Sequence, residues 1–304
     1  MLRICVPATT ANLGPGFDCL GMALALYNYL EVIEDDSDCL RLEVRGEGEK
    51  TLARNDENLI PRVMADFFTR VGHVSGGLRL VLENNIPIGK GLGSSAAAVA
   101  GALVAANHLA GSPLTRGQLL ELGAAWEGHP DNVAAALYGG VVVTARAQER
   151  IICRRFDPPP RLRVVVAVPN FVLPTSASRR VLPAAVPVED AVFNVGRTGL
   201  LVLALLQNDL ELLAVATEDR LHQPYRAPMI PGLLQVFQAA RQAGALGVTL
   251  SGAGPAVVAF VTGEEDSVGE AMCRAFRAHG VACRTQVLAP SREGAFLVGA
   301  DSGQ

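Results

Sequence analysis

Residues 87–97 read PIGKGLGSSAA and combine a glycine-rich turn with two serines. Gly91 and Gly93 can adopt positive φ, so their backbone can approach an anion with no Cβ in the way. Ser94 and Ser95 begin a tract of small apolar residues that predicts a helix, and the free N–H groups at the start of a helix attract phosphate. A serine hydroxyl there could also bind a Mg²⁺ that is held by the phosphates. The stretch predicts a phosphate-binding loop.

Two common phosphate loops do not fit this stretch. The P-loop needs Gly, four residues and then Gly-Lys-Ser/Thr, whereas Lys90 is followed by Gly91, and Asn84 stands where the first glycine would be. The dinucleotide fingerprint GxGxxA can be placed on residues 91–96, but it needs an acidic residue about 20 positions on. The next acidic residue, Glu121, lies beyond that range. An ordinary serine-capped helix after a glycine loop is the structural alternative that the residues leave open.

Further polar residues gather in five short stretches at predicted turns or helix starts. These are TTANLGPGFDCLG (9–21), EGHPDNVAAALYGG (127–140), TSASRR (175–180), HQPYRAPMIPG (222–232) and TLSGAGPA (249–256). Each stretch alone is explained by an Asx turn, a helix cap, a solvated arginine or a tight turn.

In their order along the chain, these motifs resemble those of the GHMP kinases, the family of galactokinase, homoserine kinase, mevalonate kinase and phosphomevalonate kinase. VPATTANLGPGFDCLGMAL (6–24) resembles the N-terminal motif of the family, PIGKGLGSSAAA (87–98) its signature and TLSGAGPAVVAF (249–260) its C-terminal glycine-rich motif. The first motif has the form typical of the homoserine kinases. EGHPDNVAAALYGG and TSASRRVLP (175–183) also look like that subfamily. The resemblance covers about residues 3–260.

The resemblance implies an enzyme that transfers the γ-phosphoryl group of ATP to the side-chain hydroxyl of L-homoserine, a step in threonine biosynthesis. It assigns the amino acid to Asn12, Asp18, His129, Asn132, Arg179, Arg226 and Gly252. Asp18 would face the ammonium group of the substrate. Arg179 and Arg226 would grip its carboxylate, since a guanidinium group can donate two hydrogen bonds to a carboxylate.

ATP and Mg²⁺ are the cofactors that the resemblance implies. It assigns the nucleotide to Pro87, Ile88, Gly89, Lys90, Gly91, Leu92, Gly93, Ser94, Ser95, Ala96, Ala97, Asn58 and Ser251. Within this set Asn58 would touch the adenine edge, and Lys90 would help to neutralise the triphosphate. The metal is assigned to Ser95 and Glu121, with Glu127 as the competing carboxylate and Ser94 as the competing hydroxyl.

The catalytic residues that the resemblance implies are Asn132, Thr175, Arg179 and Asp131. Thr175 would face the transferred phosphoryl group, although a helix N-cap explains it equally well. Asn132 would lie near the attacking hydroxyl. Phosphoryl transfer needs positioning and charge neutralisation more than covalent help. Either Asp131 takes the hydroxyl proton or the hydroxyl loses it directly to phosphate.

Two other functions are compatible with the family motifs. Another GHMP kinase would act on mevalonate or a sugar, but those substrates lack an ammonium group, so Asp18 combined with Arg179 and Arg226 argues against them. A non-catalytic ATP and amino-acid sensor of the same fold would be expected to have lost a metal ligand or a loop glycine, and none is missing from the motifs.

Composition favours a small polar metabolite as the partner. The chain has 304 residues, with 26 basic against 30 acidic ones, which gives no basic field for nucleic acid or an anionic membrane. The most apolar tract, residues 96–106, is too short for a bilayer, which needs about 20 residues. No secretory signal is visible in MLRICVPATT, and the six scattered cysteines form no CxxC pair. We expect a cytoplasmic protein, and a homodimer would be typical of the family.

The elements that must position these motifs follow from residue patterning. Strands are expected at 2–6, 20–34, 77–83, 141–147, 162–169, 246–254, 256–263 and 281–288. Helices are expected at 56–72, opened by Asp56, and at 94–111, 115–127, 187–207, 231–243 and 264–280.

The strongest break in the chain is FDPPPRLR (156–163), because three consecutive prolines form a stiff extended spacer. We expect an ATP-binding domain at 1–157 and a ferredoxin-like domain at 158–304. The final strand-strand-helix-strand order suits helices packed on one face of an antiparallel sheet. The resemblance implies a two-domain α+β fold, whose N-terminal part is ribosomal-protein-S5-domain-2-like with a left-handed βαβ crossover.

Overall fold

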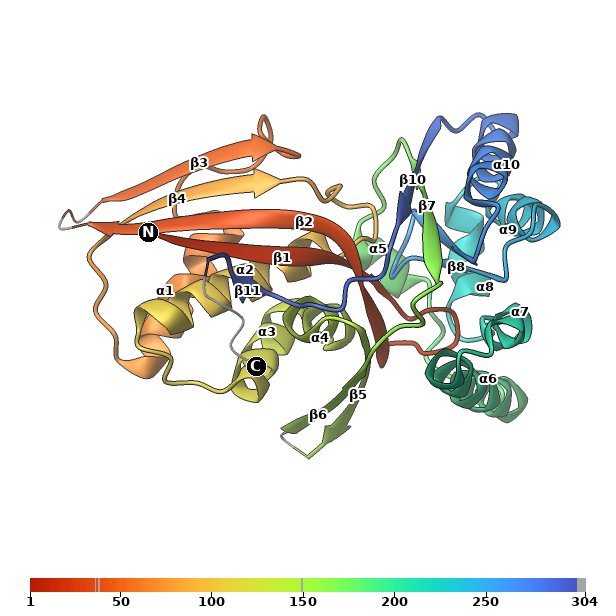
Figure 1. Cartoon of the computed structure of the whole chain (residues 1–304), viewed down its shortest axis with the longest axis horizontal. Helices are drawn as coiled ribbons and strands as arrows, with labels where there is room; N and C mark the ends of the chain where they lie inside the picture. The colour runs from red at the N-terminus through yellow and green to blue at the C-terminus, as the bar shows by residue number, and fades with distance from the viewer. Residues whose placement is uncertain (36, 38, 149, 300–304) are drawn as a thin grey trace.

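Two β-sheets, each with helices packed on it, lie side by side in the chain (Figure 1). The computed structural model describes residues 1–35, 37, 39–148 and 150–299. One sheet has seven strands and the other has four. The expected two-part α+β architecture is confirmed.

The first sheet is built on a long antiparallel pair. Its strands are β1 (Leu2–Ala11), β2 (Leu20–Asp35), β3 (Leu40–Gly46), β4 (Gly77–Asn84), β5 (Val141–Ala147), β6 (Arg150–Phe156) and β11 (Phe296–Leu297). The main path runs β11-β1-β2-β4-β3, and the β5–β6 hairpin joins it through β2. The register of β1 against β2 shifts between Pro7 and Ala8, where proline has no N–H to donate. The loop between these two strands, residues 12–19, reaches toward the second sheet (Figure 1).

Four helices cover one face of this sheet: α1 (Leu59–Val71), α2 (Ser94–Leu109), α3 (Arg116–Glu127) and α4 (Asp131–Tyr138). The alanine-rich α2 packs against α1, α3, α4 and β1, as expected for a helix that is apolar on all sides. α1 begins after Asn58, whose side chain accepts the Ile60 N–H. The prediction that Asp56 opens α1 is therefore wrong, because Asn58 is the residue that caps it. α3 begins with a capping box between Thr115 and Gln118.

The strands β3 and β4 are parallel neighbours that α1 connects. Parallel strands need such a crossover, because a tight hairpin cannot join them. The βαβ unit is therefore present in the first part of the chain, and its left-handedness stays a prediction.

The second sheet is antiparallel throughout. Its strands are β7 (Arg163–Pro169), β8 (Gly247–Leu250), β9 (Val257–Val261) and β10 (Cys283–Leu288), in the order β10-β7-β9-β8. The helices α9 (Leu233–Gln242) and α10 (Glu265–Ala278) pack against each other and on one face of the sheet (Figure 1). The predicted strand-strand-helix-strand order at the end of the chain is confirmed.

The long segment between β7 and β8 carries the remaining helices. These are α5 (Thr175–Arg180), α6 (Val188–Gln207), η1 (Leu210–Leu212), α7 (Leu213–Ala216), α8 (Gln223–Arg226) and η2 (Ala227–Met229). After β10 the chain returns to the first sheet, where β11 pairs with β1. The proposed domain boundary at 157/158 falls between β6 and β7 and stays a prediction.

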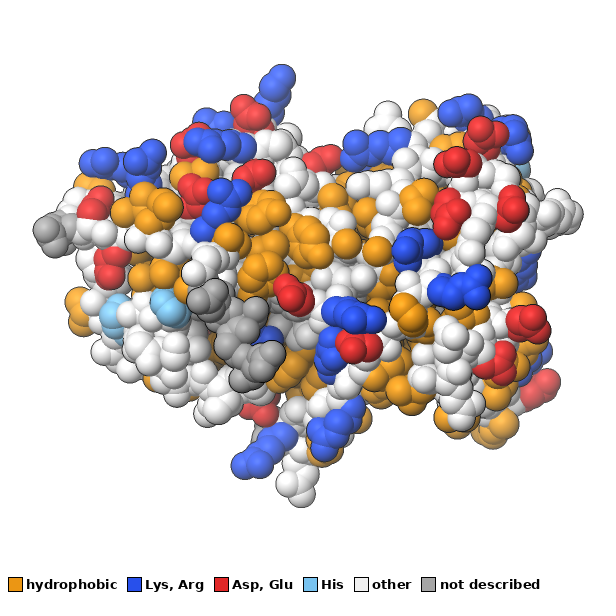
Figure 2. Space-filling view, in the orientation of Figure 1, with side chains coloured by type: hydrophobic (Ala, Val, Ile, Leu, Met, Phe, Trp, Pro, Cys, Tyr) orange, Lys and Arg blue, Asp and Glu red, His pale blue; other side chains and the backbone are white. Residues whose placement is uncertain are grey.

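Charged side chains of both signs are interspersed on the face of the molecule shown in Figure 2. In the part of the chain that the structure describes, no helix has both the length and the apolarity needed to cross a membrane.

Candidate active site

A cavity of about 500 Å³ is lined by residues from both parts of the chain. The predicted residues that line it are Asn12, Asp18, Asn58, Ile88, Gly89, Gly91, Gly93, Ser94, Ser95, Ala96, His129, Asp131, Asn132, Thr175, Arg179, Arg226 and Gly252. The predicted residues outside this lining are Pro87, Lys90, Leu92, Ala97, Glu121 and Ser251. Of these, Pro87, Leu92 and Ala97 are buried, and Leu92 and Ala97 belong to the hydrophobic core. The fold therefore brings residues of every motif to one cavity.

The glycine-rich loop leads into α2 with no side chain capping the first turn. Gly93 is the N-cap, at φ 69°, and Ser94 is already helical. The alternative of a serine-capped helix is therefore wrong. Gly91 has φ 84°, and a Cβ there would overlap the backbone carbonyl of Ser251. Free N–H groups and the positive end of the helix dipole thus lie beside Ser94 and Ser95 in the cavity wall, which suits an anion.

The second part of the chain holds this loop in place. Ser251 Oγ donates to the Gly91 carbonyl at 2.6 Å. Lys90 Nζ donates to the carbonyls of Pro169, at 3.0 Å, and Phe171, at 2.7 Å, and burial lowers the pKa of its ammonium group. Lys90 and Ser251 are thus hydrogen-bonded within the protein and lie outside the cavity lining, and their contact with the nucleotide stays a prediction.

A hydroxyl and a carboxylate meet beside the loop. Ser95 Oγ lies 2.5 Å from Glu127 Oε1, and both residues line the cavity. Glu121, the predicted metal carboxylate, lies about two turns earlier on α3 and outside the cavity. The competing residue Glu127 is the one that the packing of α3 brings to Ser95. Oxygen donors of these two kinds are the ligands that Mg²⁺ prefers, usually together with substrate phosphates.

Asp18 and Arg179 form an ion pair with two hydrogen bonds, of 2.6 and 3.0 Å. These bonds raise the pKa of Arg179. The side chains are 33% and 36% exposed, so the pair is open to the cavity. Thr175 and Arg179 stand four residues apart on α5 and so share one face of it. The N-cap of α5 is Pro174, which makes the capping alternative for Thr175 wrong.

Arg226 is a buried arginine in the wall of the cavity, with 1% of its surface exposed. Its Nη1 donates to His222 Nδ1 at 3.0 Å and to the Gly252 carbonyl at 3.1 Å. Burial lowers the pKa of Arg226 to about 10, so the group stays charged at neutral pH. The guanidinium groups of Arg179 and Arg226 lie 5.5 and 5.4 Å from the centre of the Phe17 ring. Two cations are therefore available near Asp18.

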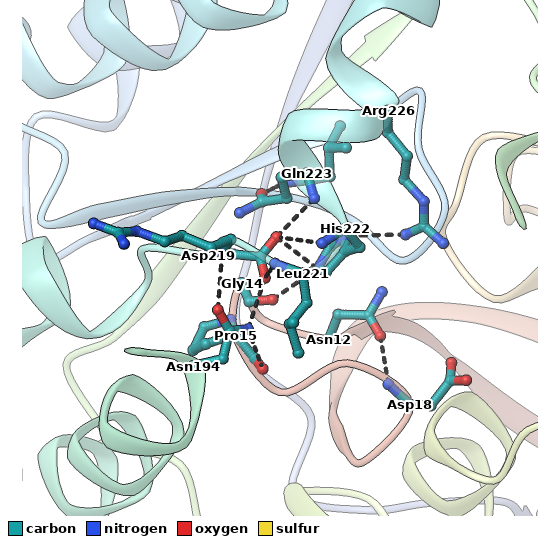
Figure 3. A network of polar contacts seen from close by, with 12 residues as sticks. Asn12, Gly14, Pro15, Asp18, Asn194, Asp219, Leu221, His222, Gln223 and Arg226 are labelled. Atoms are coloured by element: carbon teal, nitrogen blue, oxygen red, sulfur yellow. Dashed lines mark hydrogen bonds and ion pairs between the residues drawn. The ribbon is translucent and has the colours of Figure 1, made fainter. Parts of the chain in front are cut away.

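Asn12 holds the loop that carries Asp18. Its Oδ1 accepts the Asp18 N–H at 3.0 Å (Figure 3), and its Nδ2 donates to the Gly252 carbonyl at 3.0 Å. Asn12 and Asp18 have φ of 68° and 56°, a region that asparagine and aspartate tolerate better than most residues. Both polar atoms of the Asn12 side chain are thus bonded to protein backbone, and they link the two parts of the chain at the cavity.

His129, Asp131 and Asn132 form a network at the start of α4. Asp131 Oδ1 lies 2.8 Å from His129 Nδ1 and accepts the Asn132 N–H at 2.7 Å. Burial is the largest single effect on His129 and lowers its pKa, but the hydrogen bond to Asp131 and the negative charges of Asp131 and Asp18 together outweigh it and raise the pKa of the imidazole. Asn132 Oδ1 accepts the Thr9 hydroxyl at 2.8 Å. Sequence reasoning missed Thr9, although it belongs to the first motif.

Asn58 lines a largely apolar part of the cavity with Leu52, Ile60 and Leu82. Its side chain accepts the Ile60 N–H at 3.1 Å and donates to the Ala53 carbonyl at 2.8 Å. Both polar atoms are thus engaged with backbone. The apolar neighbours suit a flat ring such as adenine, whereas the predicted polar contact of Asn58 competes with its role as a helix cap.

Comparison with known proteins places the chain among related kinases. Residues 58–140 match the GHMP kinases N terminal domain, and residues 201–279 match the GHMP kinases C terminal domain. The homoserine kinase of Moorella thermoacetica is 51% identical over 293 residues, which cover 96% of this chain and 98% of that protein. The homoserine kinase of Desulfitobacterium hafniense is 42% identical and covers 98% of this chain and 100% of its own length.

A solved structure shows the same fold. The crystal structure of homoserine kinase from Cytophaga hutchinsonii matches with a TM-score of 0.88 at 29% identity, and the match covers 98% of this chain and 97% of that one.

Proposed function

The chain belongs to the GHMP kinase family, and we propose that it transfers the γ-phosphoryl group of ATP to the side-chain hydroxyl of L-homoserine. The products are O-phospho-L-homoserine and ADP, in threonine biosynthesis. Homoserine kinases with 51% and 42% identity match nearly the whole chain. The observation that carries the proposal is a single cavity lined both by the glycine-rich loop and by Asp18, Arg179 and Arg226.

The charges of the cavity suit a zwitterionic amino acid. Asp18 binds the ammonium group of homoserine, and the two arginines bind its carboxylate. Asp18 and Arg179 pair with each other in the structure. The zwitterionic substrate replaces this ion pair, because its ammonium group takes the place of Arg179 beside Asp18 and its carboxylate takes the place of Asp18 beside Arg179. Mevalonate and sugars lack an ammonium group, so they offer Asp18 no cation in exchange for Arg179.

The nucleotide lies along the glycine-rich loop. Its phosphates accept hydrogen bonds from the N–H groups at the start of α2, and its adenine occupies the apolar part of the cavity near Leu52 and Leu82. We assign a Mg²⁺ to Ser95 and Glu127, whose oxygens lie 2.5 Å apart. When bound, Mg²⁺ neutralises charge on the phosphates.

The metal assignment has a matched test. Among the described residues, no three His, Cys, Asp or Glu side chains cluster around a point, so the phosphates would supply further ligands. Ser95→Ala and Glu127→Gln are expected to raise the Mg²⁺ concentration needed for half-maximal activity, whereas Glu121→Gln leaves it unchanged. An effect of Glu121→Gln equal to that of Glu127→Gln would contradict the assignment.

The transfer step itself is direct. The homoserine hydroxyl oxygen bonds to the γ-phosphorus while the bond from that phosphorus to the β–γ bridging oxygen breaks, and ADP leaves. Thr175 and Asn132 hold the reacting groups in line. Asp131 Oδ1 is already engaged by His129 and by the Asn132 N–H. We therefore assign Asp131 to positioning, and the hydroxyl proton passes to an oxygen of the transferred phosphoryl group.

A second copy of the chain is the proposed protein partner. The helix α6 exposes Val188, Val192, Val195, Leu203 and Leu206 at helical spacing along one face. Apolar stripes of this kind favour association. Val195→Asp is expected to shift a dimer to the monomer mass in light scattering, and a wild-type protein that is monomeric at all concentrations would contradict this.

Because ATP is a cytoplasmic metabolite, we propose the cytoplasm as the compartment.

The experiment that tests the function measures ADP release from Mg²⁺-ATP with L-homoserine, mevalonate, galactose, L-serine or no acceptor. We expect release with homoserine alone. Release with mevalonate or galactose instead would move the chain to another activity of the family. If ATP bound but no acceptor raised ADP release, a non-catalytic sensor would replace the kinase.

A further inference from the structure

A buried polar network links Arg226 to His222 and Asp219, which lie outside the cavity lining (Figure 3). Its centre is His222, whose side chain is fully buried beside that of Asp219. His222 Nε2 lies 2.7 Å from the Gly14 carbonyl in the β1–β2 loop, and His222 Nδ1 lies 3.0 Å from Arg226 Nη1. One imidazole thus links the arginine to the loop that carries Asp18.

The two neighbours of His222 determine its tautomer. A carbonyl oxygen only accepts and a guanidinium only donates. The proton therefore lies on Nε2, which donates to Gly14, and the bare Nδ1 accepts from Arg226. Burial lowers the pKa of His222, although the Asp219 carboxylate, 3.5 Å from Nε2, opposes that effect. The imidazole is neutral in this arrangement.

Asp219 is committed to the backbone. Its carboxylate accepts the N–H groups of Leu221, His222 and Gln223 at 2.9, 3.0 and 2.6 Å, and it also accepts Asn194 Nδ2 at 2.8 Å. It therefore fixes the segment that leads into α8 and presents Arg226. Asn194 Nδ2 also donates to the Pro15 carbonyl at 3.0 Å, so the same network holds the β1–β2 loop a second time.

No carboxylate among the described residues makes a hydrogen bond to Arg226, although Asp18, Asp219 and Asp131 lie near enough to favour its charge. Its hydrogen-bond acceptors within the described residues are His222 Nδ1 and the carbonyls of Gly252 and Ser178, all neutral. A buried guanidinium whose hydrogen bonds all go to neutral acceptors keeps more of its attraction for an incoming anion than one that is hydrogen-bonded to a carboxylate. An aspartate or glutamate in place of His222 would neutralise the group before the substrate arrived.

We propose that His222 is a positioning residue that fixes the Arg226 guanidinium toward the substrate carboxylate and, by remaining a neutral acceptor, leaves its charge available for that carboxylate. The inference rests on the proposed function, because it takes Arg226 as a ligand of the homoserine carboxylate. It adds a residue outside the cavity lining that determines selection of an amino acid over an amino alcohol.

Two substitutions separate the two bonds of His222. In His222→Gln the amide nitrogen can take the place of Nε2 and keep the Gly14 bond, while the acceptor for Arg226 is lost. In His222→Asn the amide oxygen can take the place of Nδ1 and keep the Arg226 bond, while the donor to Gly14 is lost. His108→Gln, at an exposed site on α2, is the control.

The experiment compares kcat/KM for L-homoserine with that for 2-aminobutane-1,4-diol, which keeps the ammonium and side-chain hydroxyl but has CH₂OH in place of the carboxylate. We expect H222Q to reduce the preference for homoserine about tenfold, the effect of losing one hydrogen bond to a charged group, with the KM for ATP unchanged. H222N and the control are expected to keep the preference.

If H222Q lowered kcat/KM equally for L-homoserine and for the diol, His222 would be merely structural and the inference would be overturned. A wild-type enzyme without preference for homoserine over the diol would instead overturn the proposed role of Arg226, before any variant is considered. ¹⁵N NMR of wild-type His222 gives a second test that needs no substitution. We expect an unprotonated Nδ1 at neutral pH, and a protonated Nδ1 would overturn the inference.

Discussion

Replacing Gly91 with alanine perturbs the loop at its closest approach to the second part of the chain. At φ 84° the left-handed backbone of an alanine costs about 1–2 kcal/mol of folding free energy. The added Cβ would also overlap the Ser251 carbonyl and lie 2.9 Å from the Gly254 carbonyl oxygen. Backbone atoms cannot rotate away, so the loop must withdraw and the hydrogen bond from Ser251 Oγ to Gly91 is lost, at a cost of about 1 kcal/mol.

These effects add to about 2–3 kcal/mol for Gly91→Ala. Gly111→Ala is the matched control, because Gly111 has φ 79° but open space around its hypothetical Cβ. Gly111→Ala should lose only the backbone contribution, about 1–2 kcal/mol of folding free energy.

The assay is urea unfolding combined with KM measurements for ATP. We expect Gly91→Ala to be the less stable variant and to raise the KM for ATP at least about tenfold, since the loop is displaced from the phosphates. Gly111→Ala should leave that KM unchanged. If the two variants were equally stable and bound ATP alike, the close contact at Gly91 would not constrain the loop, and the reasoning would be refuted.

Three further predictions concern charged residues of the site. Asp18→Asn should raise the KM for homoserine about tenfold or more by removing the partner of the ammonium group, while the KM for ATP in the ADP-release assay stays unchanged. Equal changes in the two KM values would contradict the assignment of Asp18 to the ammonium group. The folded pKa of His129 is raised above its ordinary value of 6.5, so its stabilisation is fully present below that pH and is lost as the pH rises through the folded value. Urea unfolding should therefore show a larger deficit for His129→Gln at about pH 6 than at about pH 8.5, and the opposite trend would refute the sign. Lys90→Met should lower the urea midpoint while changing the KM for ATP less than about threefold, because Lys90 binds backbone carbonyls; a large rise in that KM with stability intact would restore Lys90 as a phosphate ligand.

Motif chemistry predicted the site better than it predicted the individual contacts. The glycines and the start of α2 could be foreseen because positive φ and free N–H groups depend on local sequence alone. Side-chain direction depends on packing. Lys90 lies within the glycine-rich loop, yet its side chain donates to the Pro169 and Phe171 carbonyls of the second part of the chain. The choice of Glu127 over Glu121 follows from how α3 lies against α2, which spacing from the motif could not show.

Long periodic helices were predictable, whereas the shortest helices were not. α2 and α6 have several turns of apolar residues, whereas α5 and α8 have six and four residues and therefore no period to detect. β3 escaped prediction although Leu40, Leu42 and Val44 alternate with charged residues and turn-forming residues flank the strand at 35–38 and 46–48. The link from His222 to the β1–β2 loop was equally hidden, since Gly14 lies 208 residues away in the sequence.

The most direct test of the central claim is ³¹P NMR of the product formed from Mg²⁺-ATP and L-homoserine. The account predicts a phosphomonoester on the side-chain hydroxyl, in one-to-one ratio with ADP. A phosphate on the substrate carboxylate would contradict the proposed orientation of Asp18, Arg179 and Arg226 around the amino acid. Inorganic phosphate alone, with homoserine unchanged, would contradict the kinase itself.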